Sequence, residues 1–220
     1  MITLHHCHEA RSMRTLWLLY EMELDFELKV YPFGKELRTP EYLAVHPLGR
    51  VPCLQDEDLI LFETGAITEY LVEKYPEKDL GRLPGNAERP HWLQWLHYAE
   101  TVAVHGATLT QQHIVIYEDA DRSPLLMKLE RRRLEKTLEV LDNQLSDGRE
   151  YLLESGFSAI DTNMGYSVHI SRYFTPLAAL PHLSAYYERL SARPAFQKSL
   201  PEKPAIYNKP FYDLPQENNR

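Results

Sequence analysis

The sequence has little cysteine and no long apolar run. Its 220 residues include only Cys7 and Cys53, which excludes a disulfide framework and a Cys-x-x-Cys motif. No apolar run approaches the roughly 20 residues that span a bilayer. The first ten residues also lack the basic and then apolar pattern of a secretory signal. We therefore expect a soluble cytoplasmic protein with no membrane partner.

Basic residues are outnumbered, with 24 Lys and Arg against 32 Asp and Glu, which gives a formal net charge of -8. Such a chain repels a phosphate backbone, so we expect no nucleic-acid partner. A glycine-rich phosphate loop and a Gly-x-Ser-x-Gly elbow are also missing. What remains is an ordinary composition, 44% hydrophobic and 25% charged, in a chain long enough to bury a sizeable core.

Strand-like and helical patterns alternate in residues 1–78, which we expect to form one domain. Alternating or β-branched runs predict strands at 2–6, 26–31, 51–55 and 59–62. Helical spacing of apolar residues predicts helices at 11–22 and 64–75, with a shorter one at 40–45. A strand–helix–strand start implies a right-handed parallel crossover, and the last two strands suit a hairpin. The pattern therefore predicts a small α/β domain with a mixed four-stranded sheet.

No convincing strand follows this domain. Residues 79–89 combine glycine, proline and charge, as linkers do. Apolar residues at helical spacing then predict an all-α domain over residues 90–203, with Ser123 and Ser158 as helix N-caps. Residues 204–220 show no periodicity, so we expect an irregular tail.

Two dipeptides in the first domain suit the binding of an extended peptide. Val51-Pro52 opens a strand, where a cis bond would turn the Val51 backbone toward such a peptide. Glu63-Thr64 follows a strand and opens a helix, so the Thr64 hydroxyl and free N–H groups suit a carboxylate, and Glu63 suits an ammonium. Taken singly, each dipeptide is better explained as an ordinary edge-strand proline or a helix cap.

Taken together and in this order, these segments resemble the cytosolic glutathione transferases. The carrying segments are LHHCHEARSMRTLWLLYEM, HPLGRVPCL, LFETGAITEYLVEKY and FSAIDTNMGY, and the resemblance extends to about Pro201. WLQWLHYAE, which opens the second domain, is similar to bacterial and fungal members. The resemblance implies a thioredoxin-like α/β N-terminal domain, an all-helical C-terminal domain and a homodimer.

The resemblance also implies a glutathione site, with glutathione as co-substrate and no other cofactor. The residues that match the family's binding positions are Val51 and cis-Pro52 for the cysteinyl unit, Glu63 and Thr64 for the γ-glutamyl end, and Arg50 and Arg38 as candidates for the glycyl carboxylate.

The position that activates the thiol departs from the family pattern. Ala10 stands where many members have serine, His6 where others have tyrosine, and Glu9 where the thiol-transferring classes have cysteine. A free thiol has a pKa of about 8.5, and lowering it by about 2 units needs about 2.7 kcal/mol of preferential interaction. We expect Arg11 and Ser12 jointly to be the catalytic donors, and Glu9 to oppose them by raising the thiol pKa.

Four successive residues, His5 to His8, have side chains of metal-ligand type. Along a strand only alternate residues share a face, so His6 and His8 converge while His5 and Cys7 point away. Zinc needs three or four ligands, so we expect no metal site. Cys7 is also a candidate redox thiol, with Arg11 lowering its pKa, although a half-buried strand-end cysteine is the simpler interpretation.

The resemblance implies an enzyme that conjugates glutathione to a small apolar electrophile, as in detoxification. The electrophile pocket would lie in the cleft between the domains, with Tyr98 and His105 as candidate lining residues. Two alternatives stay open. One is a glutathione-binding protein with little turnover, which the departures at Glu9 and Ala10 favour. The other is a glutathione-dependent thiol oxidoreductase or peroxidase that uses Cys7.

Overall fold

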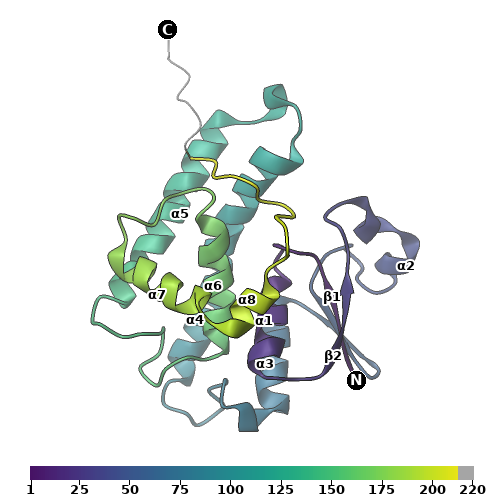
Figure 1. Cartoon of the computed structure of the whole chain (residues 1–220), viewed down its shortest axis with the longest axis vertical. Coiled ribbons are helices and arrows are strands. Elements are labelled where there is room, and N and C mark those ends of the chain that lie inside the picture. The colour runs from purple at the N-terminus through teal and green to yellow at the C-terminus, as the bar shows by residue number, and fades with distance from the viewer. Residues whose placement is uncertain (213–220) are drawn as a thin grey trace.

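A four-stranded sheet with helices on its inner face forms the N-terminal part of the chain, drawn in purple and blue in Figure 1. The computed structural model describes residues 1–212. Its first elements are β1 (Ile2–His6), α1 (Met13–Glu21), β2 (Phe26–Val30), η1 (Lys35–Arg38), α2 (Pro40–Leu43), β3 (Cys53–Asp56), β4 (Leu59–Phe62), α3 (Thr64–Lys74) and η2 (Pro76–Lys78). The strand order is β2-β1-β3-β4, with β1 and β2 parallel and the other pairs antiparallel. The mixed sheet expected from the sequence is confirmed.

The two faces of the sheet are covered differently because neighbouring residues of a strand point to opposite sides. Ile2 and Leu4 of β1 are buried in the hydrophobic core that α1 and α3 share with the sheet. His5 faces the other side, where its ring packs against Tyr31 and Tyr42. The short helix α2 therefore covers the outer face and anchors the chain that leads to β3.

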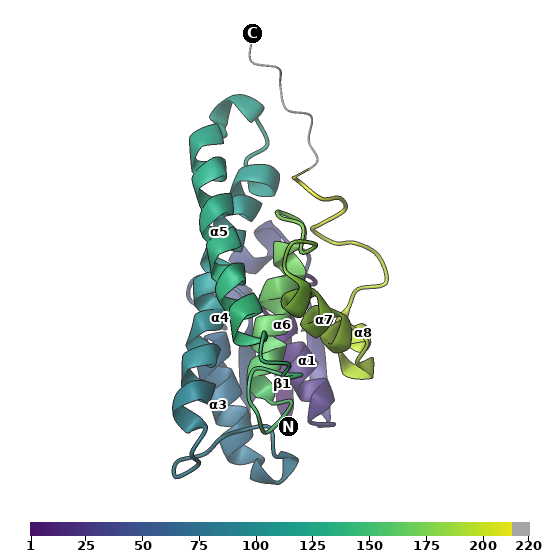
Figure 2. The same cartoon turned by 90° about the vertical axis from the view of Figure 1, so that its left-hand side faces the viewer.

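Helices make up the rest of the described chain. They are α4 (Arg89–Thr110), η3 (Gln111–Val115), η4 (Asp119–Asp121), α5 (Pro124–Gln144), α6 (Ala159–Ser171), α7 (Pro181–Ser191) and α8 (Pro194–Ser199). Figure 2 shows α4 and α5 side by side as a long hairpin. None of the helices in residues 1–212 is long and apolar enough to cross a membrane. The all-α second domain is confirmed.

Helix α6 lies at the centre of the molecule and is buried along its whole length. The Ser158 N–H donates to the Asp161 carboxylate over 2.8 Å, which fixes the start of α6. Further along α6, Gly165 lies against α1, where a β-carbon would come within 2.7 Å of Trp17. The two domains therefore touch through a contact that only glycine permits.

The expected start of one strand is wrong. The strand predicted at 51–55 begins at Cys53, because Val51 and Pro52 lie in the loop that precedes the ladder. Over residues 204–212 the expected tail contains neither helix nor strand, and Glu9 accepts three hydrogen bonds from residues 205–207. Residues 213–220 of that tail lie outside the described residues.

Candidate functional site

The loop between β1 and α1 is held by Ser12. Its hydroxyl is fully buried, lies 2.8 Å from His6 Nδ1 and accepts the Cys7 N–H over 3.1 Å. The same oxygen is 3.1 Å from the Cys7 carbonyl, so every direction of the hydroxyl is engaged within the loop. The expectation that Ser12 is a catalytic donor is therefore wrong, because its hydroxyl faces the loop and not a ligand.

Arg11 is the member of the expected pair that reaches the site. Its side chain is 38% exposed, lines the cavity described below and places Nη1 3.5 Å from Glu100 Oε2. Arg11 thus presents a positive charge directly before the start of α1.

The peptide bond between Val51 and Pro52 is cis, which confirms that expectation. Because β3 begins two residues later, the Val51 N–H and C=O lie outside the sheet ladder. The turn before them is tight: Gly49 has a φ of 58°, and a β-carbon there would clash with the Leu37 carbonyl. The sequence thus leaves one peptide group of the loop available for an extended ligand.

Arg38 and Arg50 both have exposed side chains, at the end of η1 and directly before Val51. Within residues 1–212 neither guanidinium forms an ion pair. Tyr42 holds the second segment by donating its hydroxyl to the Arg50 carbonyl over 2.7 Å. Both guanidinium groups are accessible to an anion. Within the described residues, no hydrogen bond or ion pair links the segment of Arg38 to that of Arg50.

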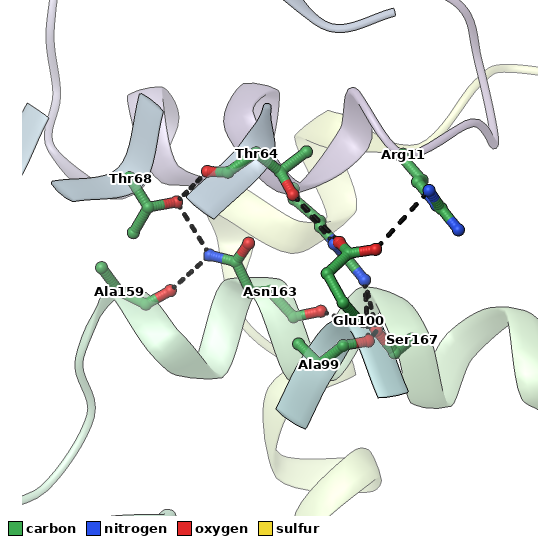
Figure 3. Close-up of polar contacts among 9 residues, drawn as sticks. Arg11, Thr64, Thr68, Ala99, Glu100, Ala159, Asn163 and Ser167 are labelled. Atoms are coloured by element: carbon green, nitrogen blue, oxygen red, sulfur yellow. Dashed lines mark hydrogen bonds and ion pairs between the residues drawn. The ribbon is translucent and has the colours of Figure 1, made fainter. Parts of the chain in front are cut away.

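Thr64 begins α3, as expected, with Glu63 exposed beside it at a φ of 77°. The Thr64 hydroxyl is not free, however. It accepts a hydrogen bond from Arg14 Nη1 over 2.9 Å and lies 3.2 Å from Glu100 Oε1, to which it donates (Figure 3). The Thr64 hydroxyl is therefore already engaged by Arg14 and by Glu100 of the second domain, a pairing that the sequence did not reveal.

Arg14 and Glu100 are site residues that the sequence reasoning did not identify. Arg14 is 1% exposed and donates to the Ser167 hydroxyl over 2.8 Å, to the Ala99 carbonyl and to the Glu100 carboxylate. Burial alone would raise the pKa of Glu100, but Arg14 and Arg11 outweigh burial and hold that pKa below its usual value. Two guanidinium groups therefore pair with the single Glu100 carboxylate, and Figure 3 shows the contact of Arg11 with it.

One sequence signal for Glu100 existed. Apolar residues of α4 at helical spacing run through Trp92, Trp95 and Ala99, and Glu100 follows directly at the edge of that buried face. A charged residue at such an edge has to find a partner across the interface.

A cavity of about 200 Å³ opens next to Arg11. Its apolar walls come from α4 and α6, through residues such as Val102, Gly106 and Ile170. Its remaining sides are the β1–α1 loop, Phe33 from the loop after β2, and the segment after α8, which contributes Ile206 and Tyr207. The cavity therefore lies between the two domains, as expected, with one wall that the sequence reasoning did not foresee.

Tyr98 and His105 do not line this cavity, so both expectations are wrong. The Tyr98 hydroxyl donates to the Thr137 carbonyl of α5 over 3.2 Å. His105 Nδ1 lies 2.7 Å from the Glu130 carboxylate, also on α5. Helix α4 is buried on two sides, against α6 and against α5, and these two residues lie on the α5 side.

Cys7 is a buried thiol and not a reactive one. Its side chain is 1% exposed. Burial, with a smaller contribution from Glu9, raises its pKa to about 11. The expectation that Arg11 lowers the Cys7 pKa is therefore wrong. A redox thiol reacts as the thiolate, which a raised pKa disfavours. Burial likewise raises the pKa of Cys53 to about 11.

His6 is fully buried, and its Nε2 lies 3.2 Å from His8 Nδ1. Within residues 1–212, no group of three or more His, Cys, Asp or Glu side chains is arranged to hold a metal ion.

Comparison with known proteins assigns both parts of the chain. Residues 1–73 match the glutathione S-transferase N-terminal domain model, and residues 110–201 match the C-terminal domain model. Glutathione S-transferase F13 of Arabidopsis thaliana is 32% identical over 202 residues, which are 86% of this chain and 89% of the relative. Glutathione S-transferase 3 of Zea mays is 29% identical over 195 residues, 86% of this chain and 87% of the relative.

Solved structures agree. A glutathione transferase from Methylococcus capsulatus superposes with a TM-score of 0.79 at 28% identity, covering 90% of this chain and 97% of that one. BphK, a bacterial transferase solved as a ternary complex, gives the same TM-score, identity and coverage.

Proposed function

This chain belongs to the glutathione S-transferase family, and from that premise we propose how its site activates glutathione and what it accepts. The chain is a glutathione transferase, with glutathione as co-substrate, and the reaction of the family uses no metal or prosthetic group. One observation carries the proposal: Arg11 lines the apolar cavity and also pairs with Glu100, which contacts Thr64. The electrophile cavity and the expected γ-glutamyl site therefore meet at one side chain.

Glutathione lies along the loop before β3 in this proposal. The free Val51 peptide group pairs with the cysteinyl unit, next to cis-Pro52. The γ-glutamyl carboxylate lies near Thr64 beside the guanidinium groups of Arg11 and Arg14, and its ammonium faces Glu63. The exposed guanidinium groups of Arg50 and Arg38 suit the glycyl carboxylate.

Arg11 stabilises the thiolate in this arrangement. The thiol proton leaves to solvent, and the sulfur lone pair forms a bond to the electrophilic carbon. A leaving group then departs with its bonding electrons, or, in an addition, the product carbanion takes a proton from solvent. A fixed cation near the sulfur favours the anion before and during attack. The electrophile is small and largely apolar, which the size and the lining of the cavity support.

An Arg11→Ala substitution tests this assignment. We expect the pKa of the bound thiol, titrated through the ultraviolet absorbance of the thiolate at saturating glutathione, to rise by about 1 unit, or about 1.4 kcal/mol. kcat/KM at neutral pH should then fall about tenfold. Arg11→Lys should lie between, and Arg132→Ala, at an exposed arginine of α5, should change neither value. An Arg11→Ala enzyme with an unchanged thiol pKa would refute the role.

The observations do not favour the two alternative functions. The departures at Ala10 and Glu9 favour a low-turnover binding protein, but in this proposal Arg11 compensates for the missing hydroxyl. A redox role for Cys7 is opposed by its burial and its raised pKa.

Three further features belong to the proposal. A homodimer is supported by exposed apolar side chains near β4, among them Leu48 and Phe62. A cytoplasmic location, which cell fractionation would check, is supported by two cysteines that are both unpaired. A role in detoxification follows from conjugation of apolar electrophiles and is checked by the sensitivity of a deletion strain to them.

A further inference from the structure

Part of the cavity wall comes from residues 204–212, here called the C-terminal segment. It follows α8 and is drawn in yellow in Figure 1, where it passes from α8 toward the far end of the α4–α5 hairpin. The segment contains neither helix nor strand, yet Ile206 and Tyr207 line the cavity and Tyr207 is only 4% exposed. A segment without secondary structure needs other bonds to stay in such a place.

Glu9 supplies the central bonds. Its Oε2 accepts the N–H groups of three successive residues, Ala205 over 3.0 Å, Ile206 over 2.5 Å and Tyr207 over 3.0 Å. Glu9 is itself 4% exposed and has a φ of 58°, a conformation that residues other than glycine seldom adopt. The loop backbone is thus strained in a way that directs this carboxylate to the segment.

Side chains attach the segment on either side of the Tyr207 backbone. The Tyr207 hydroxyl lies 2.8 Å from Thr110 Oγ1 on α4, and its ring stacks on Tyr173 at 4.8 Å. The Phe211 N–H donates to the Tyr173 carbonyl over 2.6 Å, and its ring stacks on His113. These contacts are spread over the second domain, whereas Glu9 is the contact from the first.

The position of Glu9 first suggested an electrostatic effect on the thiol. The structure gives this carboxylate a different use, because one oxygen is surrounded by three N–H donors. Hydrogen bonds from N–H groups to a carboxylate are among the stronger ones in proteins. Within residues 1–212 no arginine or lysine pairs with the Glu9 carboxylate, whose hydrogen bonds come from the C-terminal segment, while the Glu9 carbonyl accepts one from the Tyr166 hydroxyl over 3.2 Å.

We propose that Glu9 is a positioning residue that fixes the C-terminal segment across the two domains, and that Ile206 and Tyr207 thereby determine which electrophiles fit. This inference rests on the proposed conjugation and assigns part of its selectivity to a contact between the β1–α1 loop and the C-terminal segment. Small electrophiles fit in the cavity while the C-terminal segment stays in place, whereas larger ones require the segment to be displaced.

The first test measures the contact without any reaction. Hydrogen exchange of the Ala205, Ile206 and Tyr207 amides in the full-length protein should become about tenfold faster or more in Glu9→Ala, because three bonds to one carboxylate are lost. Glu9→Gln keeps a side chain of the same length with a carbonyl acceptor and should show a smaller increase in the exchange rate. Unchanged exchange in Glu9→Ala would overturn the proposal, whether or not the protein conjugates glutathione.

The second test measures selectivity as a ratio of kcat/KM values for a chloronitrobenzene and a chloronitronaphthalene. The ratio should fall about tenfold in Glu9→Ala and in Ile206→Ala, while Glu9→Gln stays closer to wild type. Asn208→Ala, at an exposed neighbour in the segment, is the matched control and should leave the ratio unchanged. If Glu9 acted only through its charge, Glu9→Gln and Glu9→Ala would both lower the thiol pKa equally and leave the ratio as it is, which would overturn the proposal.

These readouts separate two failures. A wild-type protein that does not conjugate either compound contradicts the proposed electrophile and leaves the exchange result standing. Should Glu9→Ala fail to fold, Ile206→Ala still tests the wall, because that side chain is half-buried and its loss leaves the three hydrogen bonds in place.

Discussion

Two buried histidines carry no charge in the folded protein. His6 is enclosed by the β1–α1 loop, and His169 lies on α6 with its Nδ1 2.7 Å from the Tyr187 hydroxyl. Burial lowers the pKa of each to about 3, with a further contribution from His8 to the first and from Arg172 to the second. An unfolded histidine titrates near 6.5, so the two states of the chain bind protons differently in mildly acidic solution.

This difference predicts a loss of stability on acidification. Between pH 6.5 and 3 the two histidines bind protons in the unfolded chain but stay neutral in the folded chain. The free energy of unfolding therefore falls as the pH falls. At pH 5.5 each histidine accounts for about 1.4 kcal/mol relative to pH 7.5. Urea unfolding at both values should show a drop that is smaller by about 1 kcal/mol in His169→Gln. The exposed His97→Gln should keep the whole drop, and an equal drop in all three proteins would contradict the explanation.

At the same scale, sequence reasoning succeeded where the backbone defines the chemistry. The cis bond before Pro52 was expected from the order of the matched segments, and Thr64 follows a strand directly, so both could be placed from the sequence. It failed for Ser12, Tyr98 and His105, because the direction of a side chain depends on which helix packs on which face. That information lies in contacts between distant segments and not in local spacing.

At the scale of elements, the close approach of α1 and α6 holds the two domains together. A β-carbon on Gly165 would lie 2.7 Å from Trp17 and 2.8 Å from Leu190, both of which are buried. We expect Gly165→Ala to lower the free energy of unfolding by about 1–3 kcal/mol through overpacking. Gly65→Ala on α3, where a β-carbon meets nothing within 4 Å, should not destabilise the protein. Denaturant titration measures both, and a Gly165→Ala protein as stable as wild type would show that α6 can shift.

Elements with a clear period were predictable, and their boundaries were less so. The helix expected at 64–75 spans Thr64–Lys74, whereas the strand expected at 51–55 begins two residues later. Val51 and Pro52 lie outside the hydrogen-bond ladder of β3, and the apolar composition of residues 51–55 does not reveal this.

At the scale of the whole molecule, the proposed dimer can be tested through one exposed side chain. Leu48 is 64% exposed, on the loop beside β4, where the His46 and Phe62 rings lie 4.8 Å apart. Placing a charge there should weaken a two-fold interface, since each copy would bring the same charge to the contact. We expect Leu48→Glu to shift the protein toward monomer in sedimentation velocity. Leu125→Glu, at an exposed apolar residue of α5 outside this patch, serves as the comparison. A wild-type protein that sediments as a monomer at all concentrations would refute the dimer.

The order of the two domains was also predictable, because the linker and the change of period mark the junction. The place of the C-terminal segment was not. It has no period of its own, and its place depends on contacts with residues far away in the sequence, from the Glu9 carboxylate to Thr110 and Tyr173.

That carboxylate has a consequence for how the enzyme is made. Glu9 and Ala205 are separated by 196 positions, and a ribosome delivers the first long before the second. The wall of the cavity that this contact holds can therefore close only after nearly the whole chain has been synthesised. A tag fused after the C-terminal segment would be attached next to this wall of the cavity, whereas a tag placed before β1 would not.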